Sequence, residues 1–187
     1  MQIAFVIYEG MTALDFIGVY DPLTRLKTMG FVPDLRWEIC SYSKEVRDNT
    51  GLAFTPTQVG GTLQGYDMVI VPGGFGSRKL MDDAGFIAWL GTAASCKKVS
   101  VCTGSLLLGA AGFLKGKTAT THPTAFHDLE RFCARVVDQR IVDQDEVITA
   151  RGVTSAIDLG LYLCEKLAGH EARERIRQQM DYLGTQP

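Results

Sequence analysis

Hydrophobic and polar positions follow two patterns along this chain, and together these patterns predict strands that alternate with helices. Short apolar runs bounded by turn residues are typical of strands buried on both faces, whereas apolar residues at three- and four-residue intervals indicate helices. The expected strands lie at residues 2–8, 35–42, 67–71, 98–101, 118–121, 136–142 and 146–150. The expected helices lie at residues 14–27, 83–95, 106–111, 124–133, 155–167 and 171–182.

This alternation predicts an α/β fold with a doubly wound, mostly parallel sheet and helices on both faces. Residues 46–58 carry Asp-Asn and Thr-Gly turn pairs between β-prone pieces, so we expect a small added β-hairpin there. Pro22 should kink the first helix or start a new helical segment, and Gly169 should end the penultimate helix. With no repeat, low-complexity tract or linker, we expect one domain over residues 1–187.

Composition narrows the class of protein. Hydrophobic residues make up 46% and charged residues 21% of the 187 residues, which is an ordinary globular balance. The net charge is −2 and the basic residues are scattered, so we expect no nucleic-acid partner. The apolar N-terminal run has no basic leader and stops at Glu9 and Gly10, which is too short for a membrane span.

The cysteine pattern indicates reduced thiols in a cytoplasmic protein. The cysteines are odd in number, widely spread and without a Cys-x-x-Cys pair, which argues against a disulfide framework or a zinc site. They are Cys40, Cys96, Cys102, Cys133 and Cys164. The chain also lacks a Gly-rich phosphate loop and a His-Glu-x-x-His motif, so we expect no metal and no cofactor.

The most informative segment is the strand at residues 98–101, which runs directly into Cys102 and then into a helix. Such a tight turn forces the residue at its centre into a strained backbone conformation and points its side chain over the sheet edge. The unpaired N–H groups of the helix would favour a thiolate, so we expect the pKa of Cys102 to lie below its usual value of about 8.5. The alternative is a small buried hydrophobic residue, as free cysteines commonly are.

A nucleophile needs donors for the negative charge that it creates. The Val-Pro-Gly-Gly turn ends the neighbouring strand at residues 67–71 and should face the same crevice. The N–H groups of Gly74 and Thr103 would then form an oxyanion hole. The alternative is an ordinary turn.

Asp15 and His122 are the candidate acid/base partners. Asp15 follows the first strand at the sheet edge where Cys102 should emerge, and burial there should raise the pKa of its carboxyl so that it can donate a proton to the sulfur. Its alternative role is to cap the N-terminus of a helix or to pair with the helix dipole. A Cys–His pair with His122 would suggest acyl transfer, whereas a histidine before a proline is commonly structural.

These residues together resemble the ThiJ/PfpI superfamily, which has a flavodoxin-like fold related to the class I glutamine amidotransferases. The resemblance covers nearly the whole chain, including the Leu-Asp pair after the first strand, residues 71–74, the turn at Cys102 and residues 120–122 and 152–158. It implies a homodimer. It also implies a small-molecule substrate. We assign the oxyanion or substrate-binding positions to four residues, namely Gly74, Thr103, His122 and Gly152.

Within the superfamily, the chain is most similar to the isocyanide hydratases, chiefly over residues 101–122. The nucleophile of that family maps onto Cys102 and its acid/base aspartate onto Asp15. Thr103 stands where the peptidases of the superfamily carry histidine, which argues against a Cys–His protease or amidase. The resemblance implies that a Cys102 thiolate attacks the terminal carbon of R–N≡C and that water then releases an N-substituted formamide.

Two other functions stay open. One is a non-catalytic small-molecule sensor, because the ligand-sensing domains of AraC-type regulators carry a similar turn and Leu-Asp pair. The other is a glyoxalase, deglycase or redox-sensing role, although such members of the superfamily usually pair the cysteine with glutamate. Arg151 stands where the most similar sequences have a small residue, and near the crevice it would favour an anionic substrate, whereas turned to solvent it would have no such role.

Overall fold

The computed structural model describes residues 1–184 and is built around a seven-stranded sheet. The strand order is β10-β11-β7-β6-β1-β2-β5, and every neighbouring pair is parallel except β10 with β11. The strands are β1 (Gln2–Ile7), β2 (Arg36–Ser41), β5 (Gln58–Val59), β6 (Met68–Val71), β7 (Lys97–Val101), β10 (Ile141–Asp143) and β11 (Val147–Ala150). The central strands are buried on both faces, which explains their nearly continuous apolar sequences.

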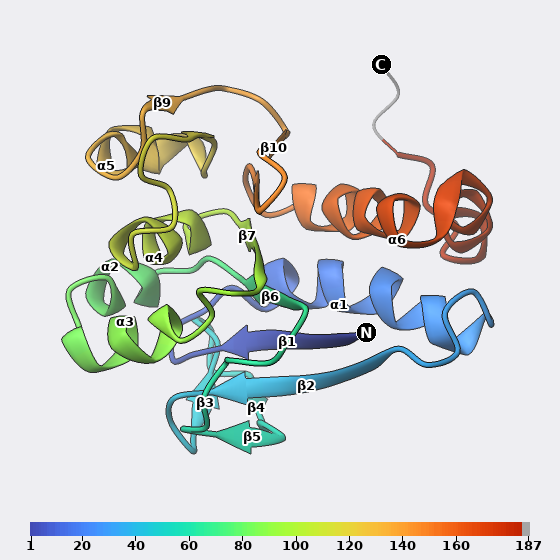
Figure 1. Cartoon of the computed structure of the whole chain (residues 1–187), viewed down its shortest axis with the longest axis horizontal. Helices are drawn as coiled ribbons and strands as arrows, with labels where there is room; N and C mark the ends of the chain where they lie inside the picture. The colour runs from blue at the N-terminus through green and yellow to red at the C-terminus, as the bar shows by residue number, and fades with distance from the viewer. Residues whose placement is uncertain (185–187) are drawn as a thin grey trace.

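The helices form two groups on either side of this sheet (Figure 1). They are α1 (Ala13–Thr28), α2 (Gly76–Leu80), α3 (Ala84–Gly91), α4 (Gly104–Ala110), α5 (Phe126–Glu130) and α6 (Ser155–Gln179). The chain steps from β1 to β2 in one direction and from β6 to β7 in the other, so right-handed crossovers place α1 and α3 on opposite faces. The predicted doubly wound, flavodoxin-like sheet is therefore confirmed. Within residues 1–184, no helix combines the length and the apolar character that crossing a membrane requires.

Helices α1 and α6 pack closely because small residues face each other at their contact. A Cβ atom added at Gly18 would lie 2.6 Å from the Cβ of Ala156, and one added at Gly160 would lie 2.5 Å from the Cγ of Pro22. Helix α1 runs without a break through Pro22, so the predicted new helical segment is absent. Gly169 has φ 86° inside α6, where the two helical segments expected from the sequence meet.

The two outer regions differ from the sequence predictions. The hairpin is confirmed as β3 (Val46–Arg47) with β4 (Ala53–Phe54), but Gln58 belongs to β5 of the main sheet. The predicted strand 136–142 is divided in two. Its end belongs to β10, which pairs with β11 as expected, but its start belongs to β9 (Arg135–Val136), which pairs with β8 (Thr118–Ala119). The polar residues 138–140 separate these strands, and Arg140 turns to Asp158 on α6.

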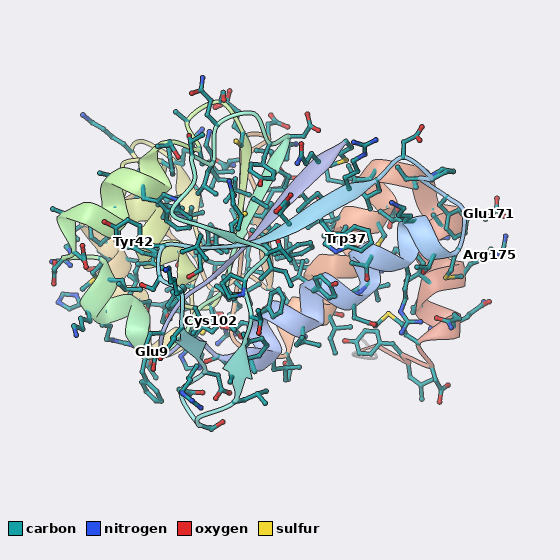
Figure 2. All side chains as sticks on the ribbon, turned by 90° about the horizontal axis from the view of Figure 1, so that it is seen from below. Glu9, Trp37, Tyr42, Cys102, Glu171 and Arg175 are labelled. Atoms are coloured by element: carbon teal, nitrogen blue, oxygen red, sulfur yellow. The ribbon has the colours of Figure 1, made fainter. Side chains whose placement is uncertain are left out.

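The predicted helix 124–133 is also shorter than expected. A 3₁₀ turn, η1 (Pro123–Ala125), precedes α5, which ends at Glu130. The short helix α2 was not predicted, because it spans barely more than one helical turn and its sequence has no clear apolar periodicity. Figure 2, seen from below, places Cys102 between the two groups of helices.

Candidate functional site

The site lies at the carboxyl ends of β1, β6 and β7, where the strand order reverses and α/β sheets commonly bind ligands. Asp15 comes from the first turn of α1, Gly73 follows β6, and Cys102 follows β7. A Cβ atom added at Gly73 would lie 2.5 Å from the backbone N of Thr103, 2.7 Å from the Cβ of Cys102 and 2.8 Å from Oδ2 of Asp15. Residue 73 must therefore be glycine for these three groups to meet.

Cys102 has the strained backbone that its position between strand and helix predicted. Its φ is 54°, in the left-handed region that residues other than glycine rarely adopt. Its N–H group donates to the carbonyl oxygens of Ala150 (3.0 Å) and Arg151 (2.9 Å). Its own carbonyl oxygen accepts from Thr121 Oγ1 (2.9 Å) and Ser105 Oγ (3.1 Å). Hydrogen bonds on both sides thus hold the cysteine in this conformation.

Asp15 is fully buried, and its carboxyl belongs to the site. Its Oδ2 accepts a hydrogen bond from the N–H of Gly73 at 3.0 Å, whereas Oδ1 has no hydrogen-bond partner within the described residues. Burial raises the pKa of Asp15 to about 6, against the opposing effect of the Gly73 hydrogen bond. The alternative role as a helix cap does not hold, because the side chain accepts no N–H of α1 in the described structure.

The predicted low pKa of Cys102 is wrong for this resting site. The residue is only 5% exposed, and burial, together with the negative charge of Asp15, raises the pKa of its thiol to about 12. The N–H of Thr103 at the start of α4 lowers this pKa, but by less than burial and the carboxylate raise it. Between these two pKa values the pair holds one proton, on the sulfur, while Asp15 is ionised.

A third buried ionisable group, Tyr8, lies beside this pair and was missed by the sequence reasoning. Burial, and then the charges of Asp15 and Cys102, raise the pKa of Tyr8 well above its usual range. Its hydroxyl donates to the carbonyl oxygen of Pro72 at 2.8 Å. Tyr8 is therefore a neutral residue that supports the Pro-Gly-Gly turn.

The predicted oxyanion hole is only partly present. The N–H of Gly74 donates to Thr103 Oγ1 at 2.9 Å, so it is not free for a ligand. Ser77 Oγ donates to the carbonyl oxygen of Gly74 at 2.7 Å and lies 2.9 Å from Thr103 Oγ1. This cluster joins the turn after β6 to the start of α4, and it leaves the N–H of Thr103 as the donor at the sulfur.

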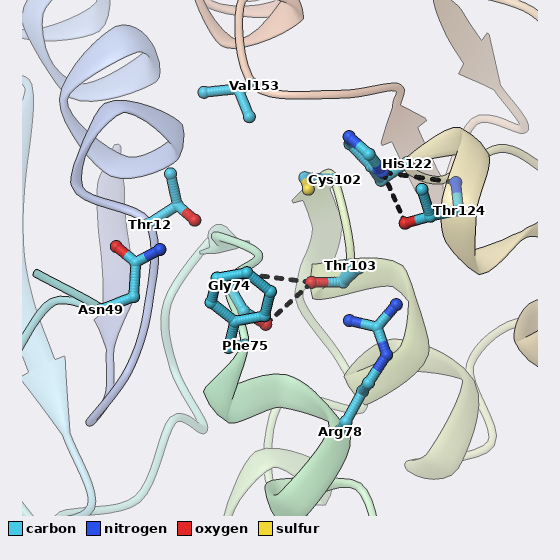
Figure 3. Close-up of a pocket in the computed structure, with 10 residues that line it drawn as sticks. All are labelled: Thr12, Asn49, Gly74, Phe75, Arg78, Cys102, Thr103, His122, Thr124 and Val153. Atoms are coloured by element: carbon cyan, nitrogen blue, oxygen red, sulfur yellow. Dashed lines mark hydrogen bonds between the residues drawn. The ribbon is translucent and has the colours of Figure 1, made fainter.

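Cys102, Thr103, Gly74 and His122 line one pocket of about 230 Å³ (Figure 3). Asp15 lies beneath this pocket, behind Gly73. The sequence reasoning missed six further lining residues, namely Thr12, Asn49, Phe75, Arg78, Thr124 and Val153. Four of them lie within a few residues after a strand: Thr12 after β1, Asn49 after β3, Phe75 after β6 and Val153 after β11. This position after a strand end is the feature of the sequence that could have indicated them.

The structure favours the structural alternative for His122, because the hydrogen bonds of its ring within the described residues go to Thr124 and not to Cys102. Its Nδ1 accepts from the N–H of Thr124 at 3.3 Å and lies 2.9 Å from Thr124 Oγ1 (Figure 3). We therefore assign the proton of the neutral ring to Nε2. Gly152 packs against this ring, since an added Cβ would lie 2.8 Å from Cδ2 of His122. Gly152 supports His122 and does not itself line the pocket with Cys102.

The hairpin brings Asn49 to the pocket. The Asp48 carboxylate accepts from the N–H groups of Thr50 and Leu52 at 2.8 Å each and so shapes the turn. The N–H of Asn49 then donates to the carbonyl oxygen of Met11 at 2.9 Å, which docks the turn against the segment between β1 and α1. The hairpin forms one wall of the site.

Arg151 does not supply the cation at the pocket. Its Nη1 lies 2.7 Å from Oδ1 of Asp138, and its guanidinium lies 5.9 Å from the centre of the Phe126 ring. Arg78, from α2, lines the pocket in its place. Within residues 1–184, no group of three His, Cys, Asp or Glu side chains is arranged to hold a metal ion.

Comparisons with known proteins show what the chain is similar to. The model of the DJ-1/PfpI family matches residues 1–166. An isonitrile hydratase from Pseudomonas putida is 35% identical over 191 aligned positions, covering 100% of this chain and 81% of that protein. Protein DJ-1alpha of Drosophila melanogaster is 26% identical over 94% of this chain and 81% of its own length. The crystal structure of a ThiJ/PfpI family protein from Pseudomonas syringae superposes with a TM-score of 0.89 at 32% identity, covering 100% of this chain and 76% of that one.

Proposed function

Because the chain belongs to the DJ-1/PfpI family, we propose that it is a cysteine-dependent isocyanide hydratase, which converts R–N≡C and water to an N-substituted formamide. The observation that carries this proposal is the strained Cys102, whose thiol lies at a pocket above a buried, ionised carboxyl. The similarity to an isonitrile hydratase along the whole chain favours this reaction over others that the same pair of residues could perform.

In the first step, the Asp15 carboxylate accepts the thiol proton while the sulfur of Cys102 forms a bond to the terminal carbon of the isocyanide. One electron pair of the carbon–nitrogen triple bond moves to the nitrogen, and the carbon, which keeps its unshared pair, takes the proton from Asp15. A thioimidate, R–N=CH–S, is then attached to Cys102. The raised pKa of Asp15, about 6, makes it a suitable carrier because it accepts and returns a proton readily near neutral pH.

In the second step, Asp15 removes a proton from a water molecule that attacks the thioimidate carbon, and Asp15 then gives this proton to the nitrogen. The carbon–sulfur bond then breaks, the hydroxyl proton passes to the departing sulfur, and R–NH–CHO leaves. One water molecule is consumed, and both residues return to their starting states. The N–H of Thr103 supports charge on the sulfur throughout, because it is already directed there at rest.

We also propose that the protein is a cytoplasmic homodimer that uses no cofactor. Leu14 and Ile17 lie one turn apart on α1 and are each 42% exposed, which supports a contact between two copies at this helix. The five free cysteines support a reducing compartment. Light scattering coupled to size exclusion should give twice the 20.5 kDa chain mass, and Leu14→Glu should lower it.

The proposed reaction is tested by mixing the protein with cyclohexyl isocyanide and following the formamide proton by NMR. We expect saturable turnover that is lost in Cys102→Ala and kept in Cys164→Ala, a matched replacement of another buried thiol. Saturable binding without any product would instead favour the sensor function. Faster consumption of methylglyoxal than of isocyanide would favour the glyoxalase function.

The redox-sensing alternative has less support. Ready oxidation requires an exposed thiolate, whereas Cys102 is 5% exposed and has a raised pKa. We therefore expect slow reaction of Cys102 with hydrogen peroxide at neutral pH. A rapid sulfenate signal, followed by mass spectrometry of the peptide that contains Cys102, would contradict this.

A further inference from the structure

Arg78 is the single charged residue among those that line the Cys102 pocket in the described structure. It lies on α2, directly after the buried Ser77, whose hydroxyl ties this helix to Gly74 and Thr103. Figure 3 shows its guanidinium pointing from α2 toward the side of the pocket where Thr103 lies. The position of Arg78 is therefore set by the same contacts that shape the site.

The guanidinium of Arg78 is weakly paired. Its contact with a carboxylate joins Nε to Oδ2 of Asp128 at 3.6 Å, which is too long for a hydrogen bond, and both side chains are about two-fifths exposed. Within residues 1–184, no hydrogen bond joins this guanidinium to another residue. Two other arginines near the pocket differ, because Arg140 bonds to Asp158 and Arg151 pairs with Asp138 at 2.7 Å. Arg78 thus keeps donors that a ligand can use.

The rest of the pocket restricts what that ligand can be. No carboxylate lines it, and Phe75 and Val153 offer apolar surface, with Phe75 75% exposed. The volume of about 230 Å³ admits only a small molecule. A single guanidinium matches the planar geometry of a carboxylate, to which it can donate two parallel hydrogen bonds.

We propose that Arg78 selects substrates that carry a carboxylate, so that the preferred substrate is a small isocyanide with an acidic group at the end opposite the reacting carbon. The second half of this statement rests on the proposed function, whereas the first half does not. Arg78 acts on the choice of substrate, and Cys102 and Asp15 perform the chemistry.

The selection is tested first by a reaction that does not depend on the proposed function. Iodoacetate and iodoacetamide both transfer a carbon to the sulfur of Cys102, forming an S–C bond and releasing iodide and a proton, but only iodoacetate is anionic. Peptide mass spectrometry measures the rate of each reagent at Cys102. The intrinsic reactivity of the thiol affects both rates equally, so it cancels in their ratio. We expect Arg78→Met to lower the iodoacetate-to-iodoacetamide ratio by about fivefold or more.

Two variants give this test its controls. Lys79→Met removes the same charge from the next residue of α2, which is exposed and does not line the pocket, and should leave the ratio within about twofold of the native value. Asp128→Asn removes the carboxylate that competes for Arg78 and should raise the ratio. An unchanged ratio in Arg78→Met, or an equal fall in Lys79→Met, would overturn the selection by Arg78.

The substrate is then tested with isocyanoacetate and its methyl ester, which differ in charge at nearly the same size. The native protein should have the higher kcat/KM for the acid, and Arg78→Met should lose that preference while it still hydrates the ester. If the alkylation ratio depends on Arg78 but neither isocyanide is hydrated, the anion selection stands and the hydratase function fails. If both are hydrated equally and the alkylation ratio is unchanged, the hydratase function stands and the selection fails.

Discussion

Cys102 and Cys164 are both buried thiols, and burial raises the pKa of each to about 12. Cys164 lies inside α6, is 0% exposed, and its Sγ contacts the carbonyl oxygen of Pro22 at 3.4 Å. Cys102 lies at a strand-to-helix junction, lines a pocket and has the carboxyl of Asp15 beside it. Equal pKa values thus accompany very different surroundings. What separates a nucleophile from a structural thiol here is access to a ligand and a nearby proton acceptor.

Removing each sulfur in turn tests the difference between the two thiols most directly. We expect Cys102→Ala to lower kcat/KM for isocyanide by at least about a thousandfold with little change in stability. Cys164→Ala should keep the activity within about twofold but lower the free energy of unfolding by about 1–2 kcal/mol, because it leaves a cavity between α6 and α1. Chemical denaturation measures the change in stability, and steady-state kinetics measures the change in activity. Equal losses of activity in the two variants would show that Cys102 is not the only thiol required for the reaction.

Removing the proton acceptor should lower the activity by less than removing the sulfur, but still strongly. In Asp15→Asn, the amide cannot take the thiol proton, so kcat should fall by about a hundredfold or more. The native rate should rise with pH through about 6, as the carboxylate ionises, and the variant should lack this rise. A native pH profile that is flat between pH 5 and 8 would show that Asp15 does not carry the proton.

Glycines test how closely the groups of the site must approach. Gly73→Ala places a Cβ within 2.5 Å of the N of Thr103 and 2.8 Å of Asp15 Oδ2, so we expect activity to fall by about a hundredfold. Gly91, at the end of α3, has no neighbour within 4 Å of an added Cβ, and Gly91→Ala should stabilise the protein by up to about 1 kcal/mol at full activity. An active Gly73→Ala variant would refute the need for close packing at the turn.

Asp15 should also reduce stability at neutral pH, which Cys164 cannot do. The pKa of Asp15 lies at about 6 in the folded protein, above 3.8 for the free group, so the folded state binds more protons between these values. Stability from this group is therefore greatest at low pH and falls as pH rises through the window, by about 3 kcal/mol at most. Asp15→Asn should be about 1–2 kcal/mol more stable than the native protein at pH 8 and no more stable at pH 4, as denaturation at both pH values can measure.

Much of the fold could be predicted because each central strand and long helix has a local apolar pattern. The strand into Cys102 and the left-handed conformation there follow from the absence of any loop between strand and helix. The single strand expected at 136–142 is interrupted because residues 138–140 use their side chains in contacts outside a strand. Arg140 bonds to Asp158 on α6, and Asp138 pairs with Arg151. The local sequence pattern does not predict these contacts, because they join residues that are far apart along the chain.

For the site, the sequence indicated which residues are the nucleophile and the carboxyl, but not which of the two carries the proton. The helix N-terminus at Thr103 can be read from sequence, whereas the depth of burial of Cys102 and Asp15 cannot, and burial is the larger effect. The same holds for Gly74, whose N–H donates to Thr103 Oγ1, a side chain distant in sequence. Arg78 was missed because it lies on a helix too short to show periodicity.

The chain's own pattern thus determined which elements form, their order, and which residue stands at the strained junction, because these depend on neighbours along the backbone. The tertiary structure decided the protonation of the Cys102–Asp15 pair, the occupation of the Gly74 N–H and the choice of Arg78 over Arg151 as the cation at the pocket. These depend on solvent exclusion and on contacts between segments far apart in sequence, and electrostatic energies change steeply with both.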